Sequence, residues 1–250
     1  MTVRSIPTAR ARRQAAGPIH PPAGIAAATG PRCPWRLLAT AVLTGLTLAT
    51  GAATAGTVSA LVTDRNGQPV VDAVVVVRPR AAGAPRQPLP MQATVNQQNM
   101  RFEPPVTLVA RGARVNFTNN DRWEHHVRGT AAGLTSFDAG GGFELRLDGR
   151  AEGKPAPSAE VTLDRAGAVL LGCHIHGSMR GHIYVSDSPW AQRTTPEGQA
   201  VFDDVPDGEA EVRVWHADQL IDLPPQIVSV GATPARVSLQ LQVVPRRRRL

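Results

Sequence analysis

Short apolar segments rich in valine recur along the chain, and glycine and proline separate them. The segment 237–243 alternates strictly, with valine and leucine at its odd positions and Ser238, Gln240 and Gln242 between them. A period of two is that of a strand with one buried face, and no segment of useful length shows a helical repeat. Many short strands separated by turns predict an all-β fold, a sandwich or a barrel. The segments that predict strands are 70–77, 115–117, 168–172, 182–185, 211–215 and 237–243.

Two turn-rich pieces, 56–76 and 195–215, stand on either side of the middle of the chain. Asn66-Gly67 in the first suits a tight hairpin turn, and the Val-Pro-Asp-Gly run at 205–208 in the second is also turn chemistry. Together these pieces resemble the opening and closing halves of a carboxypeptidase regulatory-like domain. That resemblance implies a small transthyretin-like β-sandwich, with the intervening residues inserted into its loop or packed against it.

The first 55 residues have the order of regions of a secretory signal peptide. They contain six basic residues and no acidic one, then an apolar centre at 37–48, then Ala53-Thr54-Ala55 before Gly56. Small residues at this spacing fit signal cleavage. The apolar centre is short for a bilayer, which needs about 20 apolar residues. We therefore expect a periplasmic or secreted protein with no stable membrane span after cleavage.

The charge of the chain lies largely in its ends. Without the first 55 residues, 21 basic residues remain against 20 acidic ones, a formal charge of +1. This balance removes the support that a high whole-chain pI would give to nucleic-acid binding. Four of the 21 basic residues are Arg246 to Arg249 in the terminal segment 245–250. We expect a solvated tail there, and docking of the tail to an acidic partner or anionic lipid stays an alternative.

The strongest chemical signal is a cysteine beside two histidines and a methionine. Cys33 lies in the predicted leader, so the mature chain would keep one cysteine, within the run 173–179, which reads Cys-His-Ile-His-Gly-Ser-Met. A lone thiol in an oxidising compartment is expected to be buried, catalytic or bound to metal. With His125 upstream, the chain offers two imidazoles, a thiolate and a thioether, the ligand set of a blue-copper site.

At these residues the sequence resembles the cupredoxins, in particular amicyanin- and plastocyanin-like proteins of the methylamine-utilisation type. The Cys-x-x-His-x-x-Met spacing is that of amicyanin, and Asn119 stands six residues before His125, as an Asn precedes the first ligand of the family. The resemblance implies a Greek-key β-sandwich that holds one type 1 copper ion. The ligands it implies are His125, Cys173, His176 and Met179.

The chain also departs from that family pattern. His174 and Ile175 stand where amicyanin and plastocyanin have Thr-Pro or Ser-Pro, and His126 follows the first ligand directly. Asn119, His126 and His174 are therefore candidates for second-shell or alternative ligands. Register with Asn119 favours His125 over His126 as the ligand.

Two further groups have simpler interpretations. Met100 could be another thioether ligand, but we expect it to pack in the core, and Trp215-His216 is expected to end a strand. The predicted organisation is a signal peptide at 1–55, a first regulatory-like half at 56–80, a linker at 81–90, a cupredoxin domain at 91–187, a second regulatory-like half at 188–244 and a basic tail at 245–250.

The resemblance implies a one-electron carrier that exchanges electrons with redox proteins such as a dehydrogenase, a cytochrome c or an oxidase. A mononuclear site with all its positions filled has no room for a substrate, so we expect no enzyme activity. Two alternatives stay open. One is a copper-handling protein, which the additional His126, His174 and His182 favour, and the other is a structural or ligand-binding β protein without tight metal.

Overall fold

The computed structural model describes residues 55–132 and 142–244, and these residues form sixteen strands and no helix. The predicted all-β fold is confirmed. Within these ranges no helix is long and apolar enough to cross a membrane. The predicted signal peptide, apart from Ala55, and the predicted tail at 245–250 lie outside the described residues.

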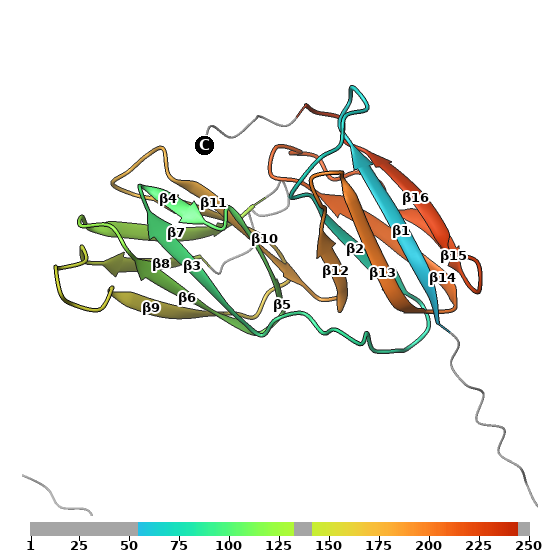
Figure 1. Cartoon of the computed structure of the whole chain (residues 1–250), viewed down its shortest axis with the longest axis horizontal. Coiled ribbons are helices and arrows are strands. Elements are labelled where there is room, and N and C mark those ends of the chain that lie inside the picture. The colour runs from blue at the N-terminus through green and yellow to red at the C-terminus, as the bar shows by residue number, and fades with distance from the viewer. Residues whose placement is uncertain (1–54, 133–141, 245–250) are drawn as a thin grey trace, which may run out of the picture. The chain divides into compact units, whose positions relative to one another are not determined.

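One pair of sheets combines strands from both ends of the described chain (Figure 1). A three-stranded sheet has the order β13-β1-β16, with β1 parallel to β16, and a four-stranded antiparallel sheet has the order β12-β2-β14-β15. We call this pair the flanking sandwich. Its strands are β1 (Ala55–Thr63), β2 (Val74–Pro79), β12 (Trp190–Arg193), β13 (Gln199–Pro206), β14 (Gly208–Trp215), β15 (Gln226–Val230) and β16 (Ala235–Gln240).

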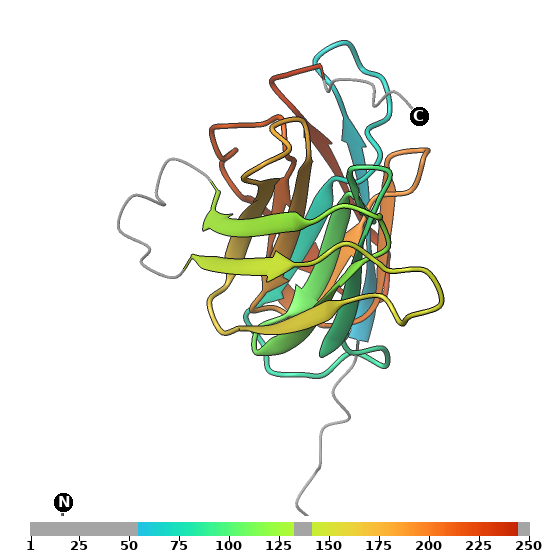
Figure 2. The same ribbon diagram turned by 90° about the vertical axis from the view of Figure 1, so that its left-hand side faces the viewer.

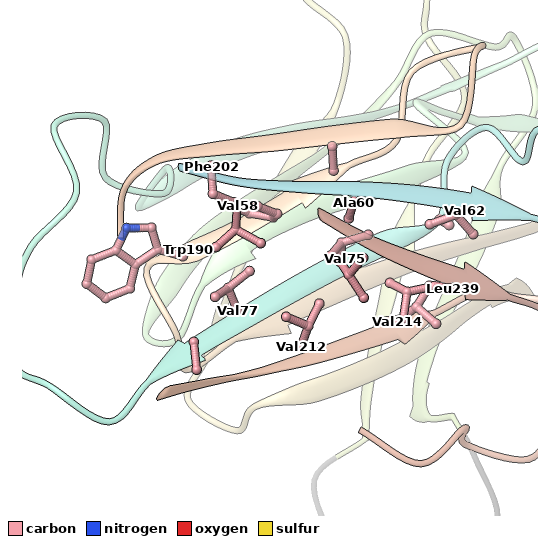
Figure 3. Close-up of a cluster of buried hydrophobic side chains, with 14 of the residues drawn as sticks. Val58, Ala60, Val62, Val75, Val77, Trp190, Phe202, Val212, Val214 and Leu239 are labelled. Atoms are coloured by element: carbon pink, nitrogen blue, oxygen red, sulfur yellow. The ribbon is translucent and has the colours of Figure 1, made fainter. Parts of the chain in front are cut away.

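The two sheets of the flanking sandwich enclose an apolar core. Alternate residues of β1 are buried, so that Val58, Ala60 and Val62 face inward. Figure 3 shows these side chains between the sheets, opposite Val75 and Val77 of β2. Burying one valine or phenylalanine side chain stabilises the fold by about 1.5–3 kcal/mol. The alternation of apolar residues therefore holds the two sheets together.

A second pair of sheets is built from the middle of the chain, the strands coloured green to gold in Figure 2. A five-stranded sheet has the order β5-β11-β10-β7-β8, and a four-stranded sheet has the order β4-β3-β6-β9. We call this pair the site sandwich. Its strands are β3 (Gln92–Gln98), β4 (Arg101–Glu103), β5 (Val106–Ala110), β6 (Ala113–Asn119), β7 (His125–Ala131), β8 (Phe143–Leu147), β9 (Ser158–Leu163), β10 (Gly167–Cys173) and β11 (Arg180–Ser186).

Two apolar stripes of the site sandwich end on polar residues. In β6, Ala113, Val115 and Phe117 are buried, and the same alternation carries Asn119 into the interior. In β10, Leu171 and Cys173 are buried, with the half-buried Gly172 between them. The period of two thus places one amide and one thiol inside the sandwich, each at the last position of its strand.

Each predicted strand segment overlaps an observed strand, but the predicted tight turn does not join two strands of one sheet. The turn at Asn66-Gly67 does form, with Gly67 at φ 79°, yet it is closed by a single bridge between Thr63 and Pro69. The strands that it joins, β1 and β2, lie in different sheets. Asp72, at φ 61°, delays β2 to Val74, four residues after the predicted segment begins. The domain boundaries given above stay predictions.

Candidate metal centre

Two neighbouring strands of the five-stranded sheet carry His125 and Cys173. Strand β7 begins at His125, and β10 ends at Cys173, which lies opposite Val127 in the antiparallel register. The chain then turns back into β11, and the N–H of Met179 donates to the carbonyl of His176 at 3.0 Å within this loop. The ordered sheet therefore brings residues far apart in sequence to one end of the sandwich.

Three donor atoms converge at this end. His125 Nδ1 lies 3.1 Å from His176 Nδ1, and Cys173 Sγ lies 3.8 Å from the first nitrogen and 3.5 Å from the second. His125 and Cys173 are buried, whereas His176 is half-buried. Cys173 is not in a disulfide.

These three distances suit a shared metal ion. Histidine nitrogen and cysteine sulfur bind such ions at about 2.0–2.3 Å, so two donors on one ion lie roughly 3–4 Å apart. Two imidazoles and one thiolate are also the donor set of the trigonal plane in blue-copper proteins. The residues present therefore fit a copper ion, which His125, Cys173 and His176 would hold.

A buried carboxylate orients the first of these histidines. Asp121 Oδ2 lies 2.8 Å from His125 Nε2. Because an ionised carboxylate only accepts hydrogen bonds, Nε2 carries the proton and donates it. The lone pair of His125 is thereby left on Nδ1, the atom that faces Cys173 and His176. A partner of this kind fixes both the tautomer and the ring orientation of a metal ligand.

The same carboxylate is held by the turn between β3 and β4. The N–H of Asn99 donates to Asp121 Oδ1 at 2.7 Å, and the N–H of Met100 donates to Oδ2 at 2.9 Å. Burial acts to raise the pKa of Asp121, but the Met100 N–H, the His125 ring and the Asn99 N–H together outweigh it and hold that pKa below its ordinary value of 3.8. The carboxylate is therefore charged when it faces His125.

Asn119 shapes the loop that leads to His125. Its Nδ2 donates to the carbonyls of Trp123 and Asp148 at 2.8 and 2.9 Å, and its Oδ1 accepts the N–H of Asp121 at 3.0 Å. The side chain is fully buried, so these bonds replace water at both ends of the amide. Asn119 contacts the backbone around the site rather than the three donor atoms.

Of the other predicted ligands, Met179 shares a buried cluster with a donor, and the two histidines lie outside the convergent group. Met179 is buried in the apolar cluster that also contains Cys173. His126 and His174 lie outside the convergent group: the N–H of His174 donates to the carbonyl of His126 at 2.9 Å, and their ring centroids are 5.6 Å apart. The donor group itself therefore contains His125 and not His126.

Sequence reasoning missed Asp121 and misplaced Met100. Asp121 is an acid four residues before a histidine, a spacing that could have singled it out once His125 was chosen. Met100, expected in the core, is 43% exposed, which corrects that prediction. Asn99 and Met100 both have positive φ, as in the two central residues of a tight hairpin turn, and this turn aims their N–H groups at Asp121.

No family model and no curated protein matches this chain. Amicyanin from Paracoccus versutus is similar in structure to 44% of this chain, over 97% of its own length, with 19% identity and a TM-score of 0.30. A mutant amicyanin with copper(I) is similar to 45% of this chain over 98% of its length, with 19% identity and a TM-score of 0.31. A purple cupredoxin from Nitrosopumilus maritimus is similar to 38% of this chain over 99% of its length, with 17% identity and a TM-score of 0.29. Identities and TM-scores this low say nothing about function. The three donor atoms and Asp121 are therefore the evidence for a metal centre.

Proposed function

We propose that this chain is an exported type 1 copper protein that carries single electrons between periplasmic redox proteins. The observation that supports this most strongly is the convergence of His125 Nδ1, Cys173 Sγ and His176 Nδ1 within 4 Å of one another. Met179, which lies in the same buried cluster as Cys173, would supply a thioether donor.

The side chains around the donors hold them in place before any metal binds. A bound copper ion would supply one-electron oxidation and reduction. Asp121 keeps the Nδ1 lone pair of His125 directed toward the thiol, and Asn119 braces the loop between β6 and β7. The antiparallel pairing of β7 with β10 fixes the separation of His125 and Cys173. Ligands that keep their positions when the ion gains or loses an electron lower the reorganisation energy of electron transfer.

Exchange with a partner would take place at His176. It is the least buried of the three donors, and its neighbour Ile175 is 50% exposed. Trp123, on the loop before His125, is 49% exposed. Exposed apolar side chains beside a redox site favour a small and transient docking surface. A dehydrogenase, a cytochrome c or an oxidase would fit this role, and the chain itself would not be an enzyme.

The other parts of the proposal concern export and the flanking sandwich. The leader at 1–55 would direct export and be cleaved before Gly56, one residue inside β1. The flanking sandwich would correspond to a regulatory-like module assembled from both ends of the mature chain. Intact-mass measurement of the exported protein tests the cleavage site, and a mature chain that begins elsewhere would contradict it.

A copper-handling role is the second candidate, and one observation favours it. His126 and His174 lie together on the surface directly behind the predicted centre, where they could take up or release an ion. This role predicts copper that exchanges readily with a chelator, whereas a carrier of electrons would retain it.

The test is an optical spectrum of the purified chain after addition of cupric ion. We expect an intense visible absorption from thiolate-to-copper charge transfer, which disappears in Cys173→Ser. In the chain with its leader retained, Cys33→Ser is the matched control, because it removes the other cysteine of the sequence, and it should keep the full absorption. Only a faint band in the unmodified chain, or a band that survives Cys173→Ser, would overturn the electron-carrier function.

A further inference from the structure

The outer face of the five-stranded sheet carries a second group of metal-binding side chains. Successive residues of a strand point to opposite faces. His125 and Cys173 point into the site sandwich, so the next residues, His126 and His174, point outward. The side chain of His126 is 34% exposed, and His174 is exposed. The period that builds the inner group therefore also places two imidazoles on the far side of the same two strands.

These two imidazoles are neighbours across the strand pair. The N–H of His174 donates to the carbonyl of His126 at 2.9 Å, which continues the register between β7 and β10 by one residue. Their ring centroids are 5.6 Å apart with 57° between the ring planes. Side chains directly opposite on antiparallel strands have Cβ atoms about 4.5–5.5 Å apart, so both rings can reach one ion.

A carboxylate on β8 supplies a third donor. Glu144 Oε2 lies 3.8 Å from His126 Nε2, a distance too long for a hydrogen bond but suitable for two atoms that bind the same ion at about 2.0–2.2 Å. The other oxygen, Oε1, accepts from Arg128 Nε at 3.0 Å. Arg128 thus holds Glu144 with its second oxygen directed at His126.

We infer that His126, His174 and Glu144 form a surface site for a borderline divalent cation such as Cu²⁺ or Zn²⁺. Imidazole nitrogens and a carboxylate suit these ions, whereas a soft cuprous ion favours sulfur ligands, which this group lacks. The site shares no side chain with the inner donors and does not depend on the proposed electron-carrier function. Water completes the coordination at this exposed position.

The experiment is a calorimetric titration of the full chain with Zn²⁺, which is redox-inactive. We expect two equivalents to bind to the unmodified chain and one to His126→Ala/His174→Ala. In the chain with its leader retained, His20→Ala is the matched control, because His20 belongs to neither proposed set of ligands, and it should still bind two. Glu144→Gln should weaken the second step by about tenfold or more, the scale on which even outer partners of metal ligands act. Glu160→Gln, at an exposed acid on β9, is its control.

Three results separate this site from the inner one. One equivalent that survives Cys173→Ser but is lost in His126→Ala/His174→Ala would support the surface site while contradicting the proposed inner centre. Equal binding by the unmodified chain and His126→Ala/His174→Ala would overturn the surface site. Binding of one equivalent that disappears in Cys173→Ser would overturn it too. Circular dichroism of each variant checks that the sheets are intact.

Discussion

The flanking sandwich and the site sandwich share one architecture but differ in the role of their buried polar residues. Both enclose an apolar core between two sheets. In the flanking sandwich the buried polar residue Thr194 joins two backbone segments, accepting the N–H of Ala73 and donating to the carbonyl of Val70. In the site sandwich, Asn119 and Asp121 instead support a histidine whose free nitrogen faces two other donors.

This difference shows how a β-sandwich can hold a group of metal-binding side chains with only a small loss of folding free energy. A buried polar group without a partner costs free energy, so a site must satisfy its polar atoms while leaving selected lone pairs free. Asp121 accepts three hydrogen bonds, one of them from His125. The apolar stripes of β6 and β10 supply the remaining stability. The site therefore lies where those stripes end.

The largest predicted effect compares one phenylalanine from each core. Phe202→Ala in the flanking sandwich and Phe117→Ala in the site sandwich should each lower the free energy of unfolding by about 3–5 kcal/mol. Only Phe117→Ala should also weaken the visible copper absorption, because Phe117 lies in the core beside the donors. Urea unfolding and the optical spectrum measure the two effects. Loss of the absorption in folded Phe202→Ala would contradict the separation of the two sandwiches, and Val201→Ala, at an exposed neighbour, is the control.

Asp121→Asn should act mainly on the metal. An amide cannot accept from Asn99, Met100 and His125 at once, because one of its two ends is itself a donor. We expect copper affinity to fall by about 10–100-fold, with a loss of stability of about 1–3 kcal/mol. Competition with a chelator of known affinity measures the first quantity. Unchanged copper affinity would show that Asp121 does not position His125. Asp164→Asn, at an exposed acid after β9, is the control.

Thr194→Val is the matching change in the flanking sandwich. Valine keeps the shape of threonine but leaves the N–H of Ala73 and the carbonyl of Val70 without their partner. The cost should be about 1–3 kcal/mol in unfolding free energy, with copper affinity unchanged. Thr233→Val, at an exposed residue between β15 and β16, is the control and should change stability by less than about 0.5 kcal/mol. A fall in copper affinity in Thr194→Val would indicate that the two sandwiches are coupled.

The smallest effect concerns an ion pair on the flanking sandwich. A hydrogen bond from Arg213, with a further contribution from Arg78, holds the pKa of Glu211 below its ordinary value of 4.5. Because the folded pKa is depressed, the stabilisation is present above that ordinary value and is lost as the pH falls through the folded pKa. Glu211→Gln should therefore cost about 0–1 kcal/mol at neutral pH and nothing at the acid end. Urea unfolding across the pH range measures this, and an equal cost at all pH values would contradict it.

Most of the strands could be predicted because alternation reports burial directly. The pattern at 237–243 holds in the structure, where Val237, Leu239 and Leu241 are buried and Ser238 and Gln240 between them are exposed. Sheet membership could not be predicted in the same way. The turn at Asn66-Gly67 suggested a hairpin, but local turn chemistry says nothing about which distant strand β1 will pair with.

The candidate site, too, could be predicted from the sequence in one part and not in the other. The motif of Cys173, His176 and Met179, together with the spacing of His125 from Asn119, predicted a donor set, and the structure brings three of its members, His125, Cys173 and His176, together. Residue types and spacing carry this information because donor chemistry is a property of the side chains themselves. The choice of His125 over His126 followed from register, and the structure places His125, not His126, in the convergent group.

Only the tertiary structure decided how those donors are supported. Asp121 contacts the turn of β3 and β4 and the ring of His125, three segments that meet through long-range pairing of strands. The same pairing brings His126, His174 and Glu144 together on the outer face from three different strands or their ends. The sequence by itself determined the strand pattern and the types of side chain offered to a metal, because alternation and ligand chemistry are local. The orientation and tautomer of His125, and the group of side chains on the outer face, depend on which strands become neighbours. The neighbours of a strand are decided only when the sheets form.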